Sequence, residues 1–365
     1  MRKIRVLVVD DSVVIRRLLT DVLGADPEIE LAGTAPNGRI ALAKLPQLNP
    51  DIVTLDIEMP ELDGLGTLPE LRKAYPKLPV IMFSTLTERG ALATLDALAR
   101  GATDYVTKPA NVGSVSAAMQ SVREQLIPKI KALCPSAPPP STPRAPAPSA
   151  SAPMRAVTRF PQRYDVVVIG SSTGGPQALA AVLTKLPASF PVPIVVVQHM
   201  PPVFTHHLAV RLNQESELAV REAAGDESLQ PGQVLIAPGN FHLEIRRHGL
   251  SIKTGIQQGP PENSCRPAVD VLFRSAAQVF GAGCLAVVLT GMGQDGMRGA
   301  RHIVHAGGRV VAQDENTSVV WGMPRAVAEA GLASDVVPLS SVPNLLMRYA
   351  AVGRLAASTL QGITG

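Results

Sequence analysis

The feature that most constrains the fold of this chain is a short apolar run that ends in a glycine-rich turn and leads into a helix pattern. Asp165–Ile169 is rich in β-branched residues and is typical of a buried strand in a parallel sheet. Residues 170–175 read Gly-Ser-Ser-Thr-Gly-Gly, and Pro176 opens a helical pattern where a missing N–H is tolerated. A strand, a tight turn and a helix in this order predict an α/β fold with polar groups at one edge of its sheet.

The turn by itself leaves three uses open. A helix N-terminus can hold a phosphate group through its unpaired N–H groups. A sharp strand-to-helix turn can also present a serine nucleophile, or the turn can be no more than a tight connection. Residues 170–175 match neither the Walker lysine pattern nor G-x-G-x-x-G nor G-x-S-x-G. The use of the turn therefore depends on which other side chains reach the same edge of the sheet.

Length and composition fit a soluble protein of two α/β domains. The chain has 365 residues, of which 46% are hydrophobic and 3% aromatic, and its net charge of +4 is dispersed, so we expect no nucleic-acid partner. The separated cysteines Cys134, Cys265 and Cys284 predict no disulfide framework or zinc site and favour a reducing compartment. The apolar start of the chain ends at Asp10, and no later run could cross a bilayer. We therefore expect a cytoplasmic protein without direct membrane insertion.

Residues 1 to about 130 alternate strand and helix patterns, which predicts a doubly wound parallel sheet. Pro69 interrupts the third helix pattern, so we expect that helix to start late or to be kinked. The expected strands cover residues 4–9, 30–35, 51–56, 80–84 and 104–107.

Charged and hydroxyl side chains gather at the carboxyl ends of these strand patterns, where open α/β sheets bind ligands. They are Asp10, Asp11, Asp56, Ser84 and Lys108. Three carboxylates at one edge repel each other unless a cation neutralises them, and oxygen ligands suit Mg²⁺. One carboxylate could then accept a phosphoryl group held by the metal, Lys108 and Ser84. Each residue alone has a simpler explanation as a helix cap or a solvated charge, but their shared edge favours a common site.

Three stretches, Val8–Ser12, Leu55–Pro60 and Val106–Pro109, resemble the signature of two-component receiver domains. The resemblance covers residues 1 to about 125 and implies a flavodoxin-like sheet. It also implies roles for particular residues: phosphorylation at Asp56, Mg²⁺ ligation by Asp10, Asp11 and Asp56, phosphoryl sensing by Ser84 and Lys108, and an aromatic switch at Tyr105.

A segment rich in Pro, Ala and Ser cannot build a helix or a sheet and separates two domains. We interpret it as a semi-extended linker. The predicted organisation is a receiver domain at 1–127, a linker at 128–162, a catalytic domain with a Rossmann-like parallel sheet at 163–356, and a C-terminal tail at 357–365.

Candidate catalytic groups follow three different buried strand patterns of the second domain: Ser172, His199 and Asp295. If these strands are parallel neighbours, the three side chains meet at one edge. A histidine can then take the proton of the serine, and a carboxylate can orient the imidazole. Each residue alone is as well explained as a turn or strand-end residue. In the same domain, His242–Ile245 and Leu250–Thr254 predict a hairpin on the rim.

A serine that attacks an ester or amide carbonyl needs donors for the oxyanion that forms. The backbone N–H groups of Thr173 and Met292 are candidates, because both lie in glycine-rich turns with unpaired donors. One such donor typically lowers the barrier by about 2.7–4 kcal/mol.

The motifs Gly170–Gly175, Gln198–Pro201 and Leu289–Gly296 resemble those of the chemotaxis protein-glutamate methylesterases, the CheB family, and Val269–Phe273 matches a later helix of that family. The receiver–linker–esterase order matches over nearly the full length. The resemblance implies hydrolysis of glutamate methyl esters on chemoreceptors with release of methanol, and deamidation of receptor glutamines. It assigns Ser172 as nucleophile, His199 as base and Asp295 as the residue that orients the base.

The resemblance further implies two protein partners: the cytoplasmic helices of chemoreceptors, and a chemotaxis histidine kinase as phosphodonor. Mg²⁺ serves phosphorylation, and ester hydrolysis requires no cofactor. The domain order suggests that the unphosphorylated receiver covers the catalytic edge and that phosphorylation of Asp56 weakens this contact. Two other functions are a receptor- or nucleotide-binding output module without hydrolytic activity, and a DNA-binding regulator, which the missing recognition-helix pattern disfavours.

Overall fold

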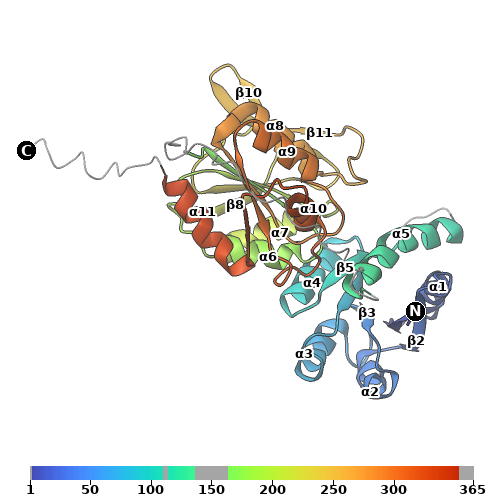
Figure 1. The fold of residues 1–365 in the computed structure, drawn as a ribbon. Coiled ribbons are helices and arrows are strands. Elements are labelled where there is room, and N and C mark those ends of the chain that lie inside the picture. The colour runs from blue at the N-terminus through green and yellow to red at the C-terminus, as the bar shows by residue number, and fades with distance from the viewer. Residues whose placement is uncertain (1, 110–113, 136–162, 353–365) are drawn as a thin grey trace, which may run out of the picture.

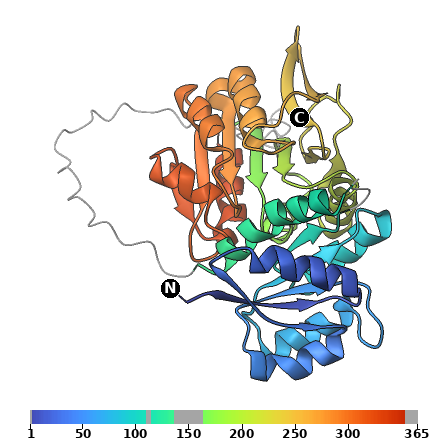
Figure 2. The ribbon, with the colours of Figure 1, turned by 90° about the vertical axis from the view of Figure 1, so that its right-hand side faces the viewer.

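The computed structural model describes residues 2–109, 114–135 and 163–352, which form two α/β domains (Figure 1). Each domain has one parallel sheet with helices on both faces, as predicted. Figure 2 shows the N-terminal domain below the larger C-terminal domain. Within the described ranges, no helix is both long and apolar enough to span a membrane. The predictions for the tail and for most of the linker fall outside these ranges, and the domain boundaries stay predictions.

The N-terminal sheet has the strand order β2-β1-β3-β4-β5, and all of its strands are parallel. Helices α2, α3 and α4 pack on one face, and α1 and α5 on the other. Its strands are β1 (Ile4–Val9), β2 (Ile29–Ala35), β3 (Ile52–Asp56), β4 (Val80–Ser84) and β5 (Asp104–Thr107). Its helices are α1 (Val13–Gly24), α2 (Gly38–Leu48), α3 (Gly64–Ala74), α4 (Glu88–Ala99) and α5 (Val115–Leu133).

Of the two alternatives expected at Pro69, a late start or a kink of α3, the late start is wrong, because the helix begins at Gly64 and continues through the proline. Proline has no N–H and leaves the carbonyl four residues earlier without its helical partner. That carbonyl belongs to Leu65, and Arg100 Nη1 donates to it at 3.5 Å. A side chain from beyond α4 thus compensates for the lost backbone bond.

The C-terminal sheet has the order β14-β13-β12-β6-β7-β9-β8 and is parallel throughout. Its strands are β6 (Val166–Ser171), β7 (Ile194–Gln198), β8 (Ala219–Glu222), β9 (Gln233–Ile236), β12 (Cys284–Val288), β13 (Arg309–Gln313) and β14 (Asp335–Val337). Its helices are α6 (Gly175–Leu183), α7 (Phe204–Glu215), α8 (Val269–Phe280), α9 (Met297–His305), α10 (Met323–Glu329) and α11 (Val342–Ala351), with short 3₁₀ turns at Gly281–Gly283 and Leu339–Ser341.

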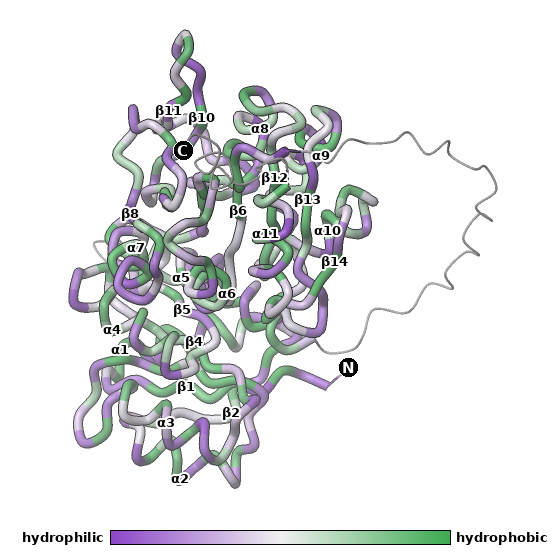
Figure 3. The backbone as a smooth tube through the Cα atoms, turned by 90° about the vertical axis from the view of Figure 1, so that its left-hand side faces the viewer, coloured by the Kyte–Doolittle hydropathy of each residue, from purple (hydrophilic) through white to green (hydrophobic). Residues whose placement is uncertain are grey.

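The predicted rim hairpin is confirmed as β10 (His242–His248) and β11 (Ser251–Gln257), which pair antiparallel. Figure 3 shows the hairpin projecting at the end opposite the N-terminal domain. Leu243 and Ile245 are buried against the core under α8, whereas the outer part of β10 is exposed.

The order of the strands in each sheet determines where polar residues meet. In both sheets the first strand has neighbours on both sides, because the chain first builds the sheet in one direction and then returns to extend it in the other. Open α/β sheets bind ligands beyond the carboxyl ends of the strands at this point. It lies between β1 and β3 in the N-terminal domain and between β6 and β12 in the C-terminal domain.

Candidate active site and phosphorylation site

The turns after β6 and β12 lie against each other. Ser172 N donates to Thr290 O at 3.0 Å, and Gly175 N donates to Ser172 O at 2.7 Å. Gly174 has a φ of +74°, a backbone conformation that side chains disfavour. A Cβ atom at Gly291 would lie 2.9 Å from the Cβ of Ser172, so a side chain there would displace the serine. The glycines of the two motifs thus permit the close approach that places Ser172 between the strand ends.

Gln198, the last residue of β7, joins the ends of β6 and β7. Its Oε1 accepts from Ser171 Oγ at 2.7 Å, and its Nε2 donates to Ser172 O at 3.0 Å and to His199 O at 3.2 Å. Ser171 is fully buried and its hydroxyl is occupied by this bond, whereas Ser172 is partly exposed. Across the described part of the chain, Ser172 Oγ makes no hydrogen bond. Of the two serines in the turn, Ser172 is therefore the one with an available hydroxyl.

His199 and Asp295 form a hydrogen-bonded pair at the same edge. His199 Nε2 lies 2.8 Å from Asp295 Oδ2. Asp295 is 2% exposed and also accepts hydrogen bonds from the N–H groups of Val269 and Asp270, at the start of α8, and of Gly296. These N–H groups and His199 outweigh the effect of burial, so the pKa of Asp295 lies below its usual value. Asp295 is therefore a fixed anion that orients the imidazole.

The second ring nitrogen of His199 faces a thiol. Cys265 Sγ lies 3.6 Å from His199 Nδ1. Burial disfavours the charged imidazolium, but the Asp295 carboxylate and the Cys265 contact outweigh it and raise the pKa of His199 from 6.5 to about 10. Because Asp295 binds Nε2, Nδ1 is the nitrogen that remains for a proton from serine.

Two of the three predicted catalytic side chains, those of His199 and Asp295, are joined by a direct hydrogen bond. Ser172 follows β6, the strand that lies between β7 and β12 in the sheet. The two predicted oxyanion donors lie in the turns that flank Ser172. The backbone N–H groups of Thr173 and Met292 have no hydrogen-bond partner within the described residues. They are thus free to donate to a ligand.

The carboxylates of Asp10, Asp11 and Asp56 gather at the corresponding edge of the N-terminal sheet, with one ligand atom from each within 4.8 Å of the others. Lys108 Nζ lies 3.0 Å from Asp10 Oδ2 and 2.8 Å from Asp56 Oδ2. Burial and the charge of Asp10 raise the pKa of Asp56 from 3.8 to about 6 despite this lysine. Three converging carboxylates that still repel one another fit a divalent cation that prefers hard oxygen ligands, such as Mg²⁺.

The two predicted sensor residues lie in different places. Ser84 lines a cavity of about 220 Å³ together with Asp56 and Lys108, and its hydroxyl donates to Gly90 O at 3.1 Å. Tyr105 does not line this cavity. Its buried ring stacks on Phe204 of α7 in the other domain, with centroids 4.9 Å apart and an interplanar angle of 8°.

The N-terminal domain also contacts the turn that carries Ser172 directly. Asp104 Oδ2 accepts hydrogen bonds from Thr173 Oγ1 at 2.8 Å and from Lys129 Nζ at 2.6 Å. Gln177 Nε2 on α6 donates to Ala102 O at 2.9 Å. The loop and strand around β5 therefore lie against the turn that carries Ser172.

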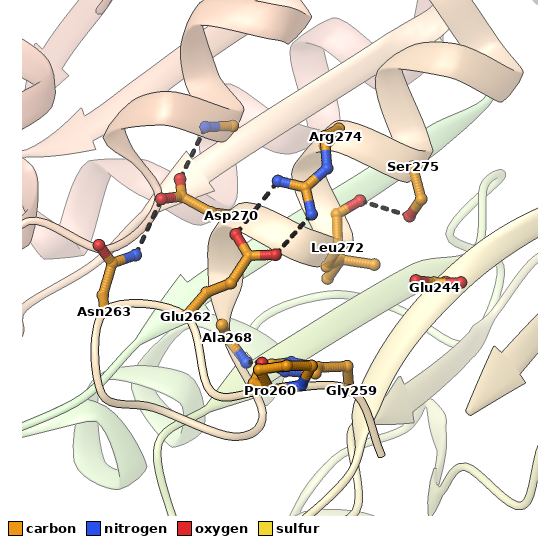
Figure 4. Close-up of polar contacts among 12 residues, drawn as sticks. Glu244, Gly259, Pro260, Glu262, Asn263, Ala268, Asp270, Leu272, Arg274 and Ser275 are labelled. Carbon is orange, nitrogen blue, oxygen red and sulfur yellow. Dashed lines mark hydrogen bonds and ion pairs between the residues drawn. The ribbon is translucent and has the colours of Figure 1, made fainter. Parts of the chain in front are cut away.

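Sequence reasoning assigned no role to several residues that complete these sites. Gln198 lies in the motif Gln198–Pro201, and membership of that motif is the only feature of the sequence that points to a role for it. Asn263 and Cys265 lie in the loop between β11 and α8, and Figure 4 shows Asn263 beside Asp270. The Asp104–Thr173 contact joins two domains, and a local pattern carries no information about such a contact.

The fold and the two sites define a class of protein: a response regulator with an enzymatic output domain built on a parallel α/β sheet. The N-terminal part matches the response regulator receiver domain over residues 6–120, and the C-terminal part matches the CheB methylesterase domain over residues 167–346. The chain belongs to the family of protein-glutamate methylesterases/protein-glutamine glutaminases.

Full-length relatives support this membership. A protein-glutamate methylesterase/protein-glutamine glutaminase of Nocardioides sp. is 57% identical over 355 residues, covering 96% of each chain. One from Trichodesmium erythraeum is 51% identical over 350 residues, covering 95% of this chain and 99% of its own. The crystal structure of the Thermotoga maritima CheB methylesterase catalytic domain aligns with a TM-score of 0.50 and 46% identity, over 51% of this chain and 98% of that domain. The names of these relatives support the interpretation of this chain as an enzyme and disfavour the alternative of a binding module without hydrolytic activity.

Proposed function

We propose that this protein hydrolyses glutamate methyl esters, and deamidates glutamines, on the cytoplasmic helices of chemoreceptors, and that Ser172, His199 and Asp295 carry out the chemistry. The observation that carries the proposal is the hydrogen-bonded His199–Asp295 pair on the strand end next to the available Ser172 hydroxyl. Its place of action is the cytoplasm, where the receptor helices and the phosphodonor kinase are found.

The reaction proceeds in two steps, in which a glutamyl ester forms on Ser172 and is then hydrolysed. Ser172 Oγ attacks the ester carbonyl carbon while its proton passes to His199 Nδ1. For this transfer, the Ser172 side chain rotates toward Nδ1, the ring nitrogen that faces Cys265 in the structure. The C–O bond to the methoxy group breaks, and the departing group takes that proton and leaves as methanol. Water then attacks the glutamyl ester on Ser172, His199 again serves as base, and the glutamate carboxylate and the free serine are released.

Backbone donors stabilise the negative charge that develops on the carbonyl oxygen. We assign this role to the N–H groups of Thr173 and Met292, which flank Ser172 and lack other partners within the described residues. Asp295 remains ionised and holds the imidazole through Nε2. Deamidation follows the same path with ammonia as the leaving group.

Asp56 receives the phosphoryl group from a chemotaxis histidine kinase. Asp10, Asp11 and Asp56 would hold Mg²⁺. When bound, the ion would neutralise the negative charge of the phosphoryl oxygens. Lys108 already bridges Asp10 and Asp56, and it and the Ser84 hydroxyl would hold the remaining phosphoryl oxygens.

Phosphorylation acts on the contact between the two domains. In the unphosphorylated chain, Asp104 binds Thr173 beside the nucleophile, and Tyr105 stacks on Phe204. A macromolecular substrate cannot approach the turn while β5 covers it. Phosphorylated Asp56 attracts Ser84 and Lys108, the residues at the ends of β4 and β5, and so weakens the contact that Asp104 and Tyr105 make.

The decisive experiment labels the chain with a serine-directed phosphonate and maps the modified peptide. We expect labelling at Ser172, and Ser172→Ala should reduce methanol release from methylated receptor by several orders of magnitude. Ser171→Ala is the matched control: it removes a neighbouring buried hydroxyl and should keep labelling and most activity. Near-normal turnover of Ser172→Ala would refute the proposal.

A second experiment tests the regulation separately. Asp56→Asn should retain basal hydrolysis and lose its stimulation by a phosphodonor. Persisting stimulation of this variant would refute control through Asp56 and would leave the assignment of the hydrolase intact.

A further inference from the structure

Two buried carboxylates lie next to each other at the start of α8. Asp295 is 2% exposed and Asp270 is 1% exposed. The side-chain amide of Asn263 lies between them: its Nδ2 donates to Asp295 Oδ1 at 2.8 Å and to Asp270 Oδ2 at 2.9 Å. Figure 4 shows Asn263 reaching toward Asp270 from the loop that precedes the helix. One amide group therefore supplies a donor to each of two neighbouring anions.

Asp270 itself has a structural partner on the other side. Its Oδ1 accepts from Gly299 N at 2.7 Å, which joins α8 to the first turn of α9. Burial and the negative charge of Asp295 raise the pKa of Asp270. Without Asn263, the two carboxylates would lose the one side-chain donor that contacts both of them, and Asp295 Oδ1 would keep only the backbone N–H groups of Asp270 and Gly296.

The loop that carries Asn263 is built to hold this amide in place. Asn263 and Ser264 both have a positive φ, +52° and +62°, a conformation that asparagine tolerates better than most residues. The adjacent Glu262 forms a two-pronged ion pair with Arg274 of α8, at 2.7 and 3.2 Å, which Figure 4 also shows. The loop is thus tied to the same helix whose N-terminus holds Asp295.

We propose that Asn263 is a positioning residue for catalysis: it separates Asp295 from Asp270 and keeps the Asp295 carboxylate aligned with His199 Nε2. This inference rests on the proposed function of the triad. Asn263 touches neither Ser172 nor the reacting atoms, so it acts only through Asp295.

The test measures kcat and KM for methanol release from methylated receptor, using the full-length chain stimulated by a phosphodonor. Asn263→Gly removes the amide and keeps the left-handed backbone available. We expect kcat to fall about 10-fold or more while KM stays within about two-fold. Asn263→Asp preserves size and backbone tolerance but adds a third carboxylate, so its kcat should fall further than that of Asn263→Gly.

The same substitution in an Asp295→Asn background separates positioning from simple support of the fold. Because the anion that Asn263 positions is then absent, Asn263→Gly should cost less than about three-fold there. Asn240→Gly is the matched control. Asn240 also has a positive φ, +65°, and binds Arg266 of the same loop, but it does not contact the triad. Its kcat should stay within about two-fold of the unmodified protein.

Equal losses from Asn263→Gly in both backgrounds, or a milder effect of Asn263→Asp than of Asn263→Gly, would overturn the inference. Unchanged kcat in Asn263→Gly would do the same. If Ser172→Ala abolishes activity while the Asn263 variants behave normally, only this inference fails. If Ser172→Ala is also active, the proposed function fails with it.

Discussion

The two parallel sheets of this protein use carboxylates at equivalent positions for opposite purposes. At the N-terminal edge, burial and the charge of Asp10 raise the pKa of Asp56 to about 6, although Ile57 N and Lys108 Nζ both donate to its carboxylate. At the C-terminal edge, Asp295 accepts from three backbone N–H groups and one amide, and its pKa is lowered. Several backbone donors at a helix N-terminus keep a carboxylate ionised, whereas burial beside a second carboxylate prepares one to receive a cation.

The comparison predicts the largest effect on activity for the replacement of Asp295. Asp295→Asn should lower kcat by about 10³- to 10⁴-fold, because the amide no longer holds the imidazole in the required tautomer. The acidic limb of the pH–rate profile should also move to lower pH. His199 acts as a base only when neutral, and loss of the neighbouring anion lowers its raised pKa. A limb that stays in place or moves to higher pH would contradict the role of Asp295 as a fixed anion.

The next effect concerns the stability of the receiver domain. The pKa of Asp56 is about 6 in the folded chain against a usual 3.8, so the folded state binds more protons between these values. Its free energy of unfolding therefore falls as pH rises from about 4 to above 6, by up to about 3 kcal/mol. Asp56→Asn should reduce this dependence in denaturant titrations without Mg²⁺, and the remainder belongs to Asp10, whose pKa burial also raises. A dependence of equal size in the variant would show that another group causes it.

The smallest predicted effect tests the connection between the two edges. Tyr105→Ala removes the ring that stacks on Phe204, and such aromatic pairs contribute about 0.5–1.5 kcal/mol beyond burial. Unphosphorylated Tyr105→Ala should hydrolyse receptor esters about two- to ten-fold faster, with little change in the stimulated rate. Equal basal rates would mean that this contact does not restrict access. Leu250→Ala, at the exposed hairpin tip, serves as a control that alters no interdomain contact.

Most of the fold and the outline of both sites could be predicted because their signals are local. Val166–Ile169 and Cys284–Val288 are continuous apolar runs, which parallel strands buried on both faces require, and each ends in a glycine-rich turn. By contrast, the expected late start of α3 at Pro69 is wrong: the helix begins at Gly64, and Arg100 from beyond α4 donates to the carbonyl that the proline leaves without a partner. Tertiary partners of this kind leave no trace in a local pattern.

The amino-acid sequence by itself determined the two sheets, their strand ends and the residue types that meet there, because strand burial and turn chemistry depend on neighbours in the chain. Only the tertiary structure decided which groups are in contact: that Gln198 engages Ser171 and leaves Ser172 available, that Asn263 joins Asp270 to Asp295, and that Asp104 covers the catalytic turn. Most of these contacts join residues far apart in the chain. They depend on the angles and distances at which whole elements pack.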